Sequence, residues 1–379
     1  MQKAQRMSSK VRIESSGHEF VVEDKETVLA AALRQGIPLA YSCRNGSCGT
    51  CKGRLISGQV DYGVYEDKAM SAEERNAGHV LFCQAIPQSD LVIDAKEIDA
   101  ARGIPIKILP CRVMKLEKLA HDVMQLSLKL PEGQRLQFLA GQYIDILLAG
   151  NKRRSFSLAN APGSDELLQL HIRHVPGGFF TDHVFNKMKE KDLLRFQGPL
   201  GTFFLREGDV QGSTNAAGGT TPGTEEVESR REQRPRTSRA ATDKPMILVA
   251  GGTGFAPIKG MLEHAMAQGI TRPMHLYWGV RARRDLYLHE LPLAWARENK
   301  HIRYTPVLSE PLPEDQWTGR TGWVHDAVAA DYPDLSGHEV YASGPPPMIA
   351  ALKGAVKKHG LPDDHLYYDS FEFAHATPV

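Results

Sequence analysis

The stretch Ser42-Cys43-Arg44-Asn45-Gly46-Ser47-Cys48-Gly49-Thr50-Cys51 contains three of the five cysteines in this chain of 379 residues. Cys83 follows at a distance, and Cys111 lies outside the group. This spacing is typical of a plant-type 2Fe-2S cluster, because two sulfide-bridged irons need four soft, anionic ligands at one site. Small residues between the cysteines let backbone N–H groups turn towards the sulfur atoms. The sequence therefore predicts that Cys43, Cys48, Cys51 and Cys83 hold such a cluster.

Two other interpretations of the cysteines are weaker. Structural zinc sites usually pair their cysteines as C-x2-C twice, and the second pair is missing here. Buried thiols without a metal would not usually gather at this spacing with glycines between them. Five cysteines are also too few for a disulfide scaffold in a chain of this length. We interpret Cys111 as a small buried residue.

The composition is that of an ordinary globular protein. Apolar residues make up 41% and charged residues 24% of the chain, and the formal net charge is +1, so nothing implies a nucleic-acid surface. No signal peptide and no unbroken apolar stretch long enough for a membrane span are evident, and we expect a cytoplasmic protein. The length allows two or three domains.

Around the cysteines, residues 9–100 form a first unit. Residues 11–13 and 20–22 predict a hairpin, residues 27–35 a helix that Gly36 ends, and residues 91–93 a closing strand. Residues 108–206 form a second unit of short alternating segments separated by turn residues. This pattern predicts an antiparallel barrel with one helix near Thr181 to Lys189.

The remaining sequence divides into a polar segment and an alternating one. Residues 207–243 contain no aromatic residue, no Leu and no Ile, so we expect a disordered insertion. Its arginine-rich part is either a partner-binding segment or a solvated loop of mixed charge. In residues 244–379, strand-like and helical segments alternate, which predicts a parallel sheet with crossover helices.

A second motif, Arg154-Ser155-Phe156-Ser157, follows Gly141-Gln142-Tyr143. A flavin needs an aromatic face, a hydroxyl near N5 and a guanidinium for its pyrophosphate, and this strand offers all three; an ordinary barrel strand is the alternative. Gly177 and Gly178 precede the predicted helix, where exposed N–H groups suit a diphosphate. Capping of that helix by Thr181 is the plainer explanation, and the two are compatible.

A third motif, residues 251–257, follows the apolar strand 246–250 and precedes a helical pattern. Its glycines allow the backbone to approach a pyrophosphate closely. Pro257 stands where the dinucleotide fingerprint has its third glycine.

In this order, the three motifs resemble the ferredoxin–NAD(P)H reductase superfamily with an N-terminal plant-type ferredoxin domain. The resemblance implies a multidomain fold: an α+β ubiquitin-like β-grasp, a six-stranded antiparallel β-barrel and an α/β nucleotide-binding domain. It assigns FAD to Arg154, Ser155, Phe156, Ser157, His171, Ile172, Arg173, Gly177, Gly178 and Thr181. It assigns the nicotinamide nucleotide to Gly252, Thr253, Gly254, Pro257, Gly279, Arg281, Ser309, Gly344 and Pro345. It places Ser157 and Ser343 beside the reacting rings, Ser343 where relatives carry a cysteine. Phe371 lies near the flavin face or serves packing.

One position bears on the choice of nucleotide. NADP-dependent relatives carry an arginine beside the serine at 309, whereas this chain has Glu310. A carboxylate repels a 2′-phosphate, so we expect NADH. Arg283 and Arg284 lie within reach, which leaves NADPH open.

The resemblance implies an NADH-dependent reductase that moves electrons from NADH through FAD and the cluster to a partner protein. It is similar to the reductase components of bacterial multicomponent oxygenases, which makes an oxygenase the expected partner. The alternative partner is a deoxysugar dehydrase, as for proteins like CDP-6-deoxy-3,4-glucoseen reductase. A redox-sensing or binding protein without turnover is the remaining alternative. Nothing in the sequence names the partner or the oligomeric state.

Overall fold

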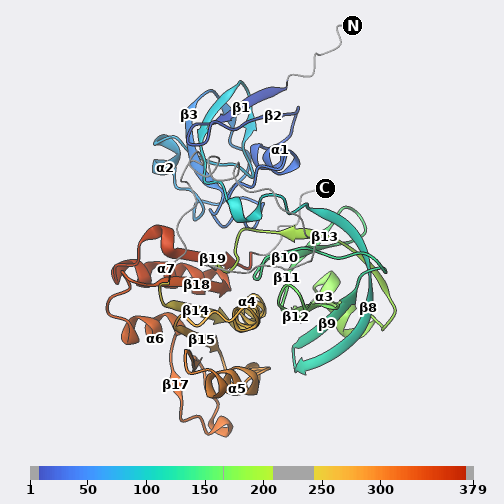
Figure 1. Cartoon of the computed structure of the whole chain (residues 1–379), viewed down its shortest axis with the longest axis vertical. Coiled ribbons are helices and arrows are strands. Elements are labelled where there is room, and N and C mark those ends of the chain that lie inside the picture. The colour runs from blue at the N-terminus through green and yellow to red at the C-terminus, as the bar shows by residue number, and fades with distance from the viewer. Residues whose placement is uncertain (1–7, 165, 208–242, 373–379) are drawn as a thin grey trace, which may run out of the picture.

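A computed structural model describes residues 8–164, 166–207 and 243–372 of the chain. These residues form a ferredoxin domain at the top of Figure 1, a barrel at the right and a nucleotide-binding domain at the lower left. The predicted insertion, apart from Glu207 and Asp243, lies outside the described residues. Among the described helices, none combines the length and the hydropathy that a membrane crossing requires.

The ferredoxin domain is a mixed five-stranded sheet with the order β2-β1-β7-β3-β5. Strand β1 pairs with β2 in antiparallel fashion and with β7 in parallel fashion, which confirms the predicted α+β fold. The larger elements are β1 (Ser9–Ile13), β2 (Glu19–Val22), α1 (Val28–Arg34), β3 (Lys52–Ser57), β5 (His79–Leu81) and β7 (Leu91–Asp94). The smaller ones are β4 (Val60–Asp61), α2 (Ala72–Asn76), β6 (Ile86–Pro87) and η1 (Asp99–Ala101).

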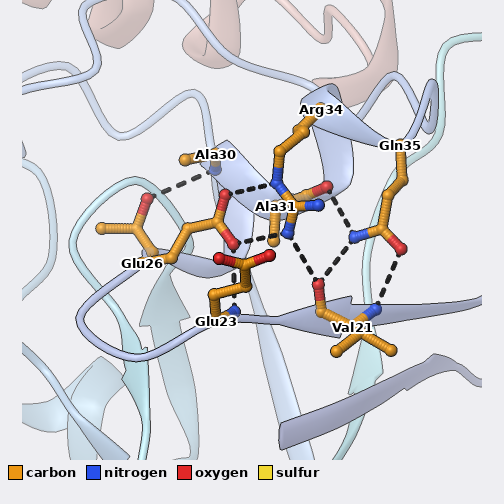
Figure 2. A network of polar contacts seen from close by, with 8 residues as sticks. Val21, Glu23, Glu26, Ala30, Ala31, Arg34 and Gln35 are labelled. Atoms are coloured by element: carbon orange, nitrogen blue, oxygen red, sulfur yellow. Dashed lines mark hydrogen bonds and ion pairs between the residues drawn. The ribbon is translucent and has the colours of Figure 1, made fainter. Parts of the chain in front are cut away.

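Helix α1 is attached to the edge strand β2 by the polar network shown in Figure 2. Arg34 donates to both carboxylate oxygens of Glu26, at 2.9 and 2.7 Å. Arg34 and Gln35 also donate to the carbonyl oxygen of Val21, at 3.1 and 2.6 Å. Thr27 caps the start of the helix by accepting from the Ala30 N–H. These bonds fix the helix within one residue of its predicted bounds at each end.

The second domain is a six-stranded antiparallel sheet with the order β11-β10-β13-β8-β9-β12. An isolated bridge between Leu158 and Leu170 joins the two edges and closes it into the predicted barrel. The elements are β8 (Lys107–Ala120), β9 (Val123–Lys129), β10 (Tyr143–Leu147), β11 (Arg153–Ser157), β12 (Leu168–Arg173), α3 (Phe179–Asn186) and β13 (Leu193–Leu200). Helix α3 begins and ends earlier than the sequence predicts.

The third domain is a parallel sheet with the order β17-β16-β15-β14-β18-β19, as predicted. The strands are β14 (Met246–Gly251), β15 (Met274–Val280), β16 (Ile302–Leu308), β17 (Arg320–Thr321), β18 (Glu339–Gly344) and β19 (Leu366–Ser370). The helices are α4 (Phe255–Ala267), α5 (Glu290–Glu298), α6 (Val324–Asp331) and α7 (Pro346–Lys358), with the short turns η3 (Gly252–Gly254), η4 (Arg283–Asp285), η5 (Pro313–Asp315) and η6 (Asp363–His365). Strand order reverses beside β14, where ligands of such sheets bind.

Candidate redox site

The loop that carries Cys43, Cys48 and Cys51 is held by backbone geometry that only glycine adopts easily. Gly46 has φ +80°, and a Cβ atom there would lie 2.8 Å from the carbonyl oxygen of Val64. Glycine at this position lets the loop make a tight turn, and the turn points amide groups towards the cysteines. The Thr50 N–H, for example, donates to Cys48 Sγ at 3.5 Å.

The four predicted ligands come together, whereas the fifth cysteine does not. The thiol of Cys43 interacts with that of Cys48, and the thiol of Cys51 with that of Cys83. Gln84 donates to Cys83 Sγ at 3.7 Å. Four soft ligands with N–H donors around them fit a 2Fe-2S cluster. Cys111 is buried in the core of the barrel.

Strand β11 presents its residues alternately to two sides, as every strand does. Ser155 donates to Asp145 of the neighbouring strand β10 at 2.6 Å, and Ser157 hydrogen-bonds to Asp369 of β19. On the other side, Phe156 lies 5.5 Å from the ring of Phe180 in α3. Ser155 and Ser157 therefore lie on one side of the strand, where Ser157 reaches another domain, and Phe156 lies on the other side together with Arg154.

His171 is a buried histidine with a free ring nitrogen. Its Nδ1 lies 3.0 Å from the hydroxyl of Tyr287 in the nucleotide-binding domain, and its Nε2 has no hydrogen-bond partner among the described residues. Burial, helped by the charge of Lys259, lowers the pKa of His171 to about 3, so the ring is neutral at neutral pH. A buried unpaired nitrogen fits a site whose partner is a bound cofactor.

The start of α3 differs from the prediction. Gly178 is the N-cap residue and Phe179 the first helical residue, so Thr181 lies inside the first turn. The Thr181 hydroxyl bonds to the backbone of Val175 and Gly178 rather than capping the helix. Capping by Thr181 is therefore wrong, because the glycine already supplies the turn. Gly177, at φ +77°, still leaves the first N–H groups of the helix available to a diphosphate.

A cavity of about 490 Å³ lies between the barrel and the ends of the parallel strands. It is lined by seven of the residues predicted to bind cofactors: Arg173, Gly252, Thr253, Gly279, Arg281, Ser309 and Pro345. Glu310 also lines it. Arg173 reaches across from the barrel, so that a Cβ atom on Gly252 would lie 3.2 Å from its guanidinium. This position suits a pyrophosphate on the glycine turn.

Beside the cavity, Gly254 explains the close approach of two segments. A Cβ atom there would lie 1.9 Å from the carbonyl oxygen of Ser343. The Ser343 hydroxyl is buried and has no partner among the described residues, which fits a contact to a nicotinamide. Strand pairing sets Ser343 opposite Asp369, and the Phe371 N–H donates to the Gly344 carbonyl at 3.0 Å. Pro257 lies in the first turn of α4.

Sequence reasoning missed two buried carboxylates, Asp145 and Asp369. Asp145 is fully buried between Ile144 and Ile146 of β10. Asp369 is also buried; burial raises its pKa to about 6, against hydrogen bonds from Ser42 and Ser157 that lower it. Asp145 interrupts a strand of apolar residues, and Asp369 follows Leu366, Tyr367 and Tyr368 near the end of β19. A carboxylate in such a strand is costly without partners, and that signal was available in the sequence.

Comparison with protein families matches all three domains. Residues 11–88 match a 2Fe-2S iron-sulfur cluster binding domain. Residues 110–205 match an oxidoreductase FAD-binding domain, and residues 248–354 match an oxidoreductase NAD-binding domain. The predicted cofactors thus agree with the domains present.

Several relatives that match over nearly their whole length are named as reductases. The CDP-6-deoxy-L-threo-D-glycero-4-hexulose-3-dehydrase reductase of Yersinia pestis is 37% identical over 96% of this chain and 99% of its own. The reductase component of phenol 2-monooxygenase from Pseudomonas sp. (strain CF600) is 34% identical over 96% and 95%. Among solved structures, the Amycolatopsis cytochrome P450 reductase GcoB is 32% identical, with a TM-score of 0.73 over 96% and 98% of the two chains.

Proposed function

This chain belongs to the ferredoxin–NAD(P)H reductase superfamily, in the group with an N-terminal 2Fe-2S domain, and we propose that its partner is the protein component of a multicomponent oxygenase. It is an NAD(P)H-dependent oxidoreductase that passes electrons through FAD and the cluster to an acceptor protein. The oxygenase proposal is supported by the relatives that act with oxygenases, such as the phenol 2-monooxygenase reductase component.

When bound, FAD would convert the electron pair of NADH into the single electrons that a 2Fe-2S cluster can carry. In this proposal, Arg154, Phe156 and Ser157 hold the flavin, with the free Nε2 of His171 as a further donor. The glycine turn 252–254 receives the pyrophosphate of NADH, with Arg173 above it. The Ser343 hydroxyl orients the nicotinamide. We place the ferredoxin, flavin and nucleotide domains at residues 9–100, 108–206 and 244–379.

The observation that supports this function is the set of hydrogen bonds that the cluster loop makes with the other two domains. Ser42, next to the ligand Cys43, donates to Asp369, which also holds Ser157 of the flavin strand. The Tyr143 hydroxyl donates to the Ser42 carbonyl at 2.7 Å. The predicted cluster and flavin sites therefore share one interface within the chain, as electron transfer between them requires.

The function is tested by an anaerobic reaction with NADH and a candidate acceptor. The purified chain is mixed with NADH, and the absorbance of flavin and cluster is followed. The reduced chain is then mixed with the oxygenase component encoded nearest to it. We expect NADH to bleach both centres and the acceptor to restore them. A cluster that stays oxidised in the presence of NADH would contradict the internal relay.

A deoxysugar dehydrase is the second candidate acceptor, favoured by the Yersinia relative. The same experiment with a dehydrase component separates the two, because only the true acceptor reoxidises the cluster rapidly. Reoxidation by the dehydrase alone would replace the oxygenase proposal. Preference for NADH is proposed from Glu310, which lines the cavity.

A further inference from the structure

The two residues that flank Cys43 both make polar contacts with other domains. Arg44 forms an ion pair with Asp145 of β10, and Ser42 donates to Asp369 of β19 at 2.7 Å. Both carboxylates are buried, with exposed fractions of 0% for Asp145 and 6% for Asp369. The side chains of both neighbours of Cys43 thus bond to a buried carboxylate of another domain.

Each of these acids also holds a serine of the flavin strand β11. Asp145 accepts from Ser155 at 2.6 Å, and Asp369 hydrogen-bonds to Ser157. The two serines are two positions apart and so project from the same side of the strand. The chain thus contains two parallel links, Arg44–Asp145–Ser155 and Ser42–Asp369–Ser157.

We propose that Asp145 and Asp369 are positioning residues that clamp the Cys43 side of the cluster loop against β11 and so set the rate at which electrons enter the cluster. The proposal rests on the function proposed above. NADH is oxidised to NAD+ with release of one proton and two electrons, and two one-electron transfers across this contact account for the pair. Neither acid needs to gain or lose a proton in this role.

Other contacts of the loop support a clamp at this side. Tyr41 and Thr202 of the barrel exchange hydrogen bonds through the Thr202 hydroxyl and backbone, at 2.9 to 3.0 Å. The Tyr368 hydroxyl donates to the Cys48 carbonyl at 3.3 Å. Every contact in this set is a directional hydrogen bond, which fixes position more narrowly than apolar packing does.

The test separates the entry of electrons into the flavin from their passage to the cluster. Ser42→Ala cuts one link on the ferredoxin side and leaves Asp369 with Ser157. Asp145→Asn removes the charge that pairs with Arg44 in the other link. The two steps are followed by stopped-flow absorbance of flavin and of cluster after mixing with NADH. The matched controls are Ser71→Ala and Glu132→Gln, since Ser71 caps α2 inside the ferredoxin domain and Glu132 is exposed on the barrel.

We expect each clamp variant to slow cluster reduction roughly tenfold or more, because a displacement of about 1 Å strongly reduces the rate of a positioned reaction. Flavin reduction by NADH should stay within about twofold of the parent chain in the same experiment. The combined Ser42→Ala, Asp145→Asn variant should be slower than either single one. Both controls should match the parent in both steps.

A second readout needs no turnover. Hydrogen exchange of the segment 41–51 in the oxidised protein should be faster in the clamp variants and unchanged in the controls. For Asp145→Asn, the neutral pair Arg44→Gln, Asp145→Asn should regain part of the protection, because the partly buried guanidinium that lost its carboxylate partner is gone.

The proposal is overturned if cluster reduction is unaffected in variants that keep their cluster absorbance, or if both steps slow equally while exchange is unchanged. No acceptor protein is used. The clamp can therefore be tested even if no oxygenase reacts with the chain. The acceptor experiment can likewise be interpreted if the clamp variants have no effect.

Discussion

The barrel meets its two neighbours through opposite kinds of boundary. Towards the nucleotide-binding domain, one hydrophobic core joins barrel residues such as Ala140 and Phe203 to Phe255, Met261 and other residues of that domain. Towards the ferredoxin domain, the core of the latter contains only its own residues, between Val11 and Ala95. The contacts across that boundary include the Tyr41–Thr202 and Tyr143–Ser42 hydrogen bonds and the Arg44–Asp145 ion pair.

Thr202 and Phe203 are adjacent in the sequence but contact different domains. Thr202 bonds to Tyr41 of the ferredoxin domain, and Phe203 belongs to the core shared with the nucleotide-binding domain. A shared core makes two domains one stability unit, whereas polar contacts orient a unit that folds around its own core. We conclude that barrel and nucleotide-binding domain form one body on which the ferredoxin domain is docked.

The largest effect should come from breaking the shared core. Phe203→Ala should lower the free energy of unfolding by about 3–5 kcal/mol, the usual cost of removing a buried phenylalanine side chain. Denaturant unfolding followed by tryptophan fluorescence measures this. The four tryptophans (Trp278, Trp295, Trp317 and Trp323) all lie in the nucleotide-binding domain.

Phe203→Leu is the control and should lose much less, because it keeps most of the buried volume. A loss below about 1 kcal/mol for the alanine variant would show that the two domains do not share a core in the sense described.

The next effect should come from the polar boundary. Thr202→Val keeps the shape of the side chain but leaves the Tyr41 N–H without its acceptor, at a cost of about 1–3 kcal/mol. Hydrogen exchange at the Tyr41 amide should accelerate roughly tenfold to a hundredfold. Tryptophan-detected unfolding should change little.

Thr202→Ser retains the hydroxyl and should behave as the parent. If Thr202→Val instead lowers the stability of the nucleotide-binding domain as much as Phe203→Ala does, the contrast between the two boundaries is wrong.

A smaller, pH-dependent effect should appear at Asp369 of the nucleotide-binding domain, which bonds to Ser42 of the ferredoxin domain and to Ser157 of the barrel. Its folded pKa, raised by burial to about 6, exceeds the ordinary value of 3.8, so the folded protein holds this proton more tightly than the unfolded chain. Stability from this group is therefore present at low pH and lost as pH rises through about 6. Between pH 6 and 5, the parent should gain about 1 kcal/mol relative to Asp369→Asn.

Unfolding of both proteins across this pH range measures the difference. A difference that stays constant from pH 7 to pH 5 would show that Asp369 keeps an ordinary pKa. In the parent, the hydroxyls of Ser42 and Ser157 are the hydrogen-bond partners of the Asp369 carboxyl.

The smallest effect should lie at the rim of the nucleotide cavity. Glu310→Arg replaces an exposed repulsive charge with an attractive one and should improve the KM for NADPH relative to NADH by about threefold, or about 0.6 kcal/mol. Glu314→Arg adds the same charge at a residue that does not line the cavity and should leave the ratio unchanged. An equal shift in both variants would point to net charge rather than to this position.

Much of the fold follows from local sequence. The helix predicted at residues 27–35 forms as Val28–Arg34, and the strand predicted at residues 91–93 forms as Leu91–Asp94. The sequence predicts that α3 begins near Thr181, whereas Gly178 is the N-cap residue and the helix begins earlier. Caps depend on the few residues that meet the first turn, and those are set by the surrounding barrel.

The cysteine spacing, the flavin strand and the glycine turn were determined by sequence alone, since the chemistry of each cofactor demands certain residue types at certain spacings. Asp145 and Asp369 acquired their partners only in three dimensions. They lie far from the cluster loop in sequence, and neither has a motif around it. Their role depends on packing that brings strands β10, β11 and β19 against one loop. Sequence thus determined which groups this protein can bind, and tertiary structure decided that the neighbours of Cys43 contact these two buried carboxylates.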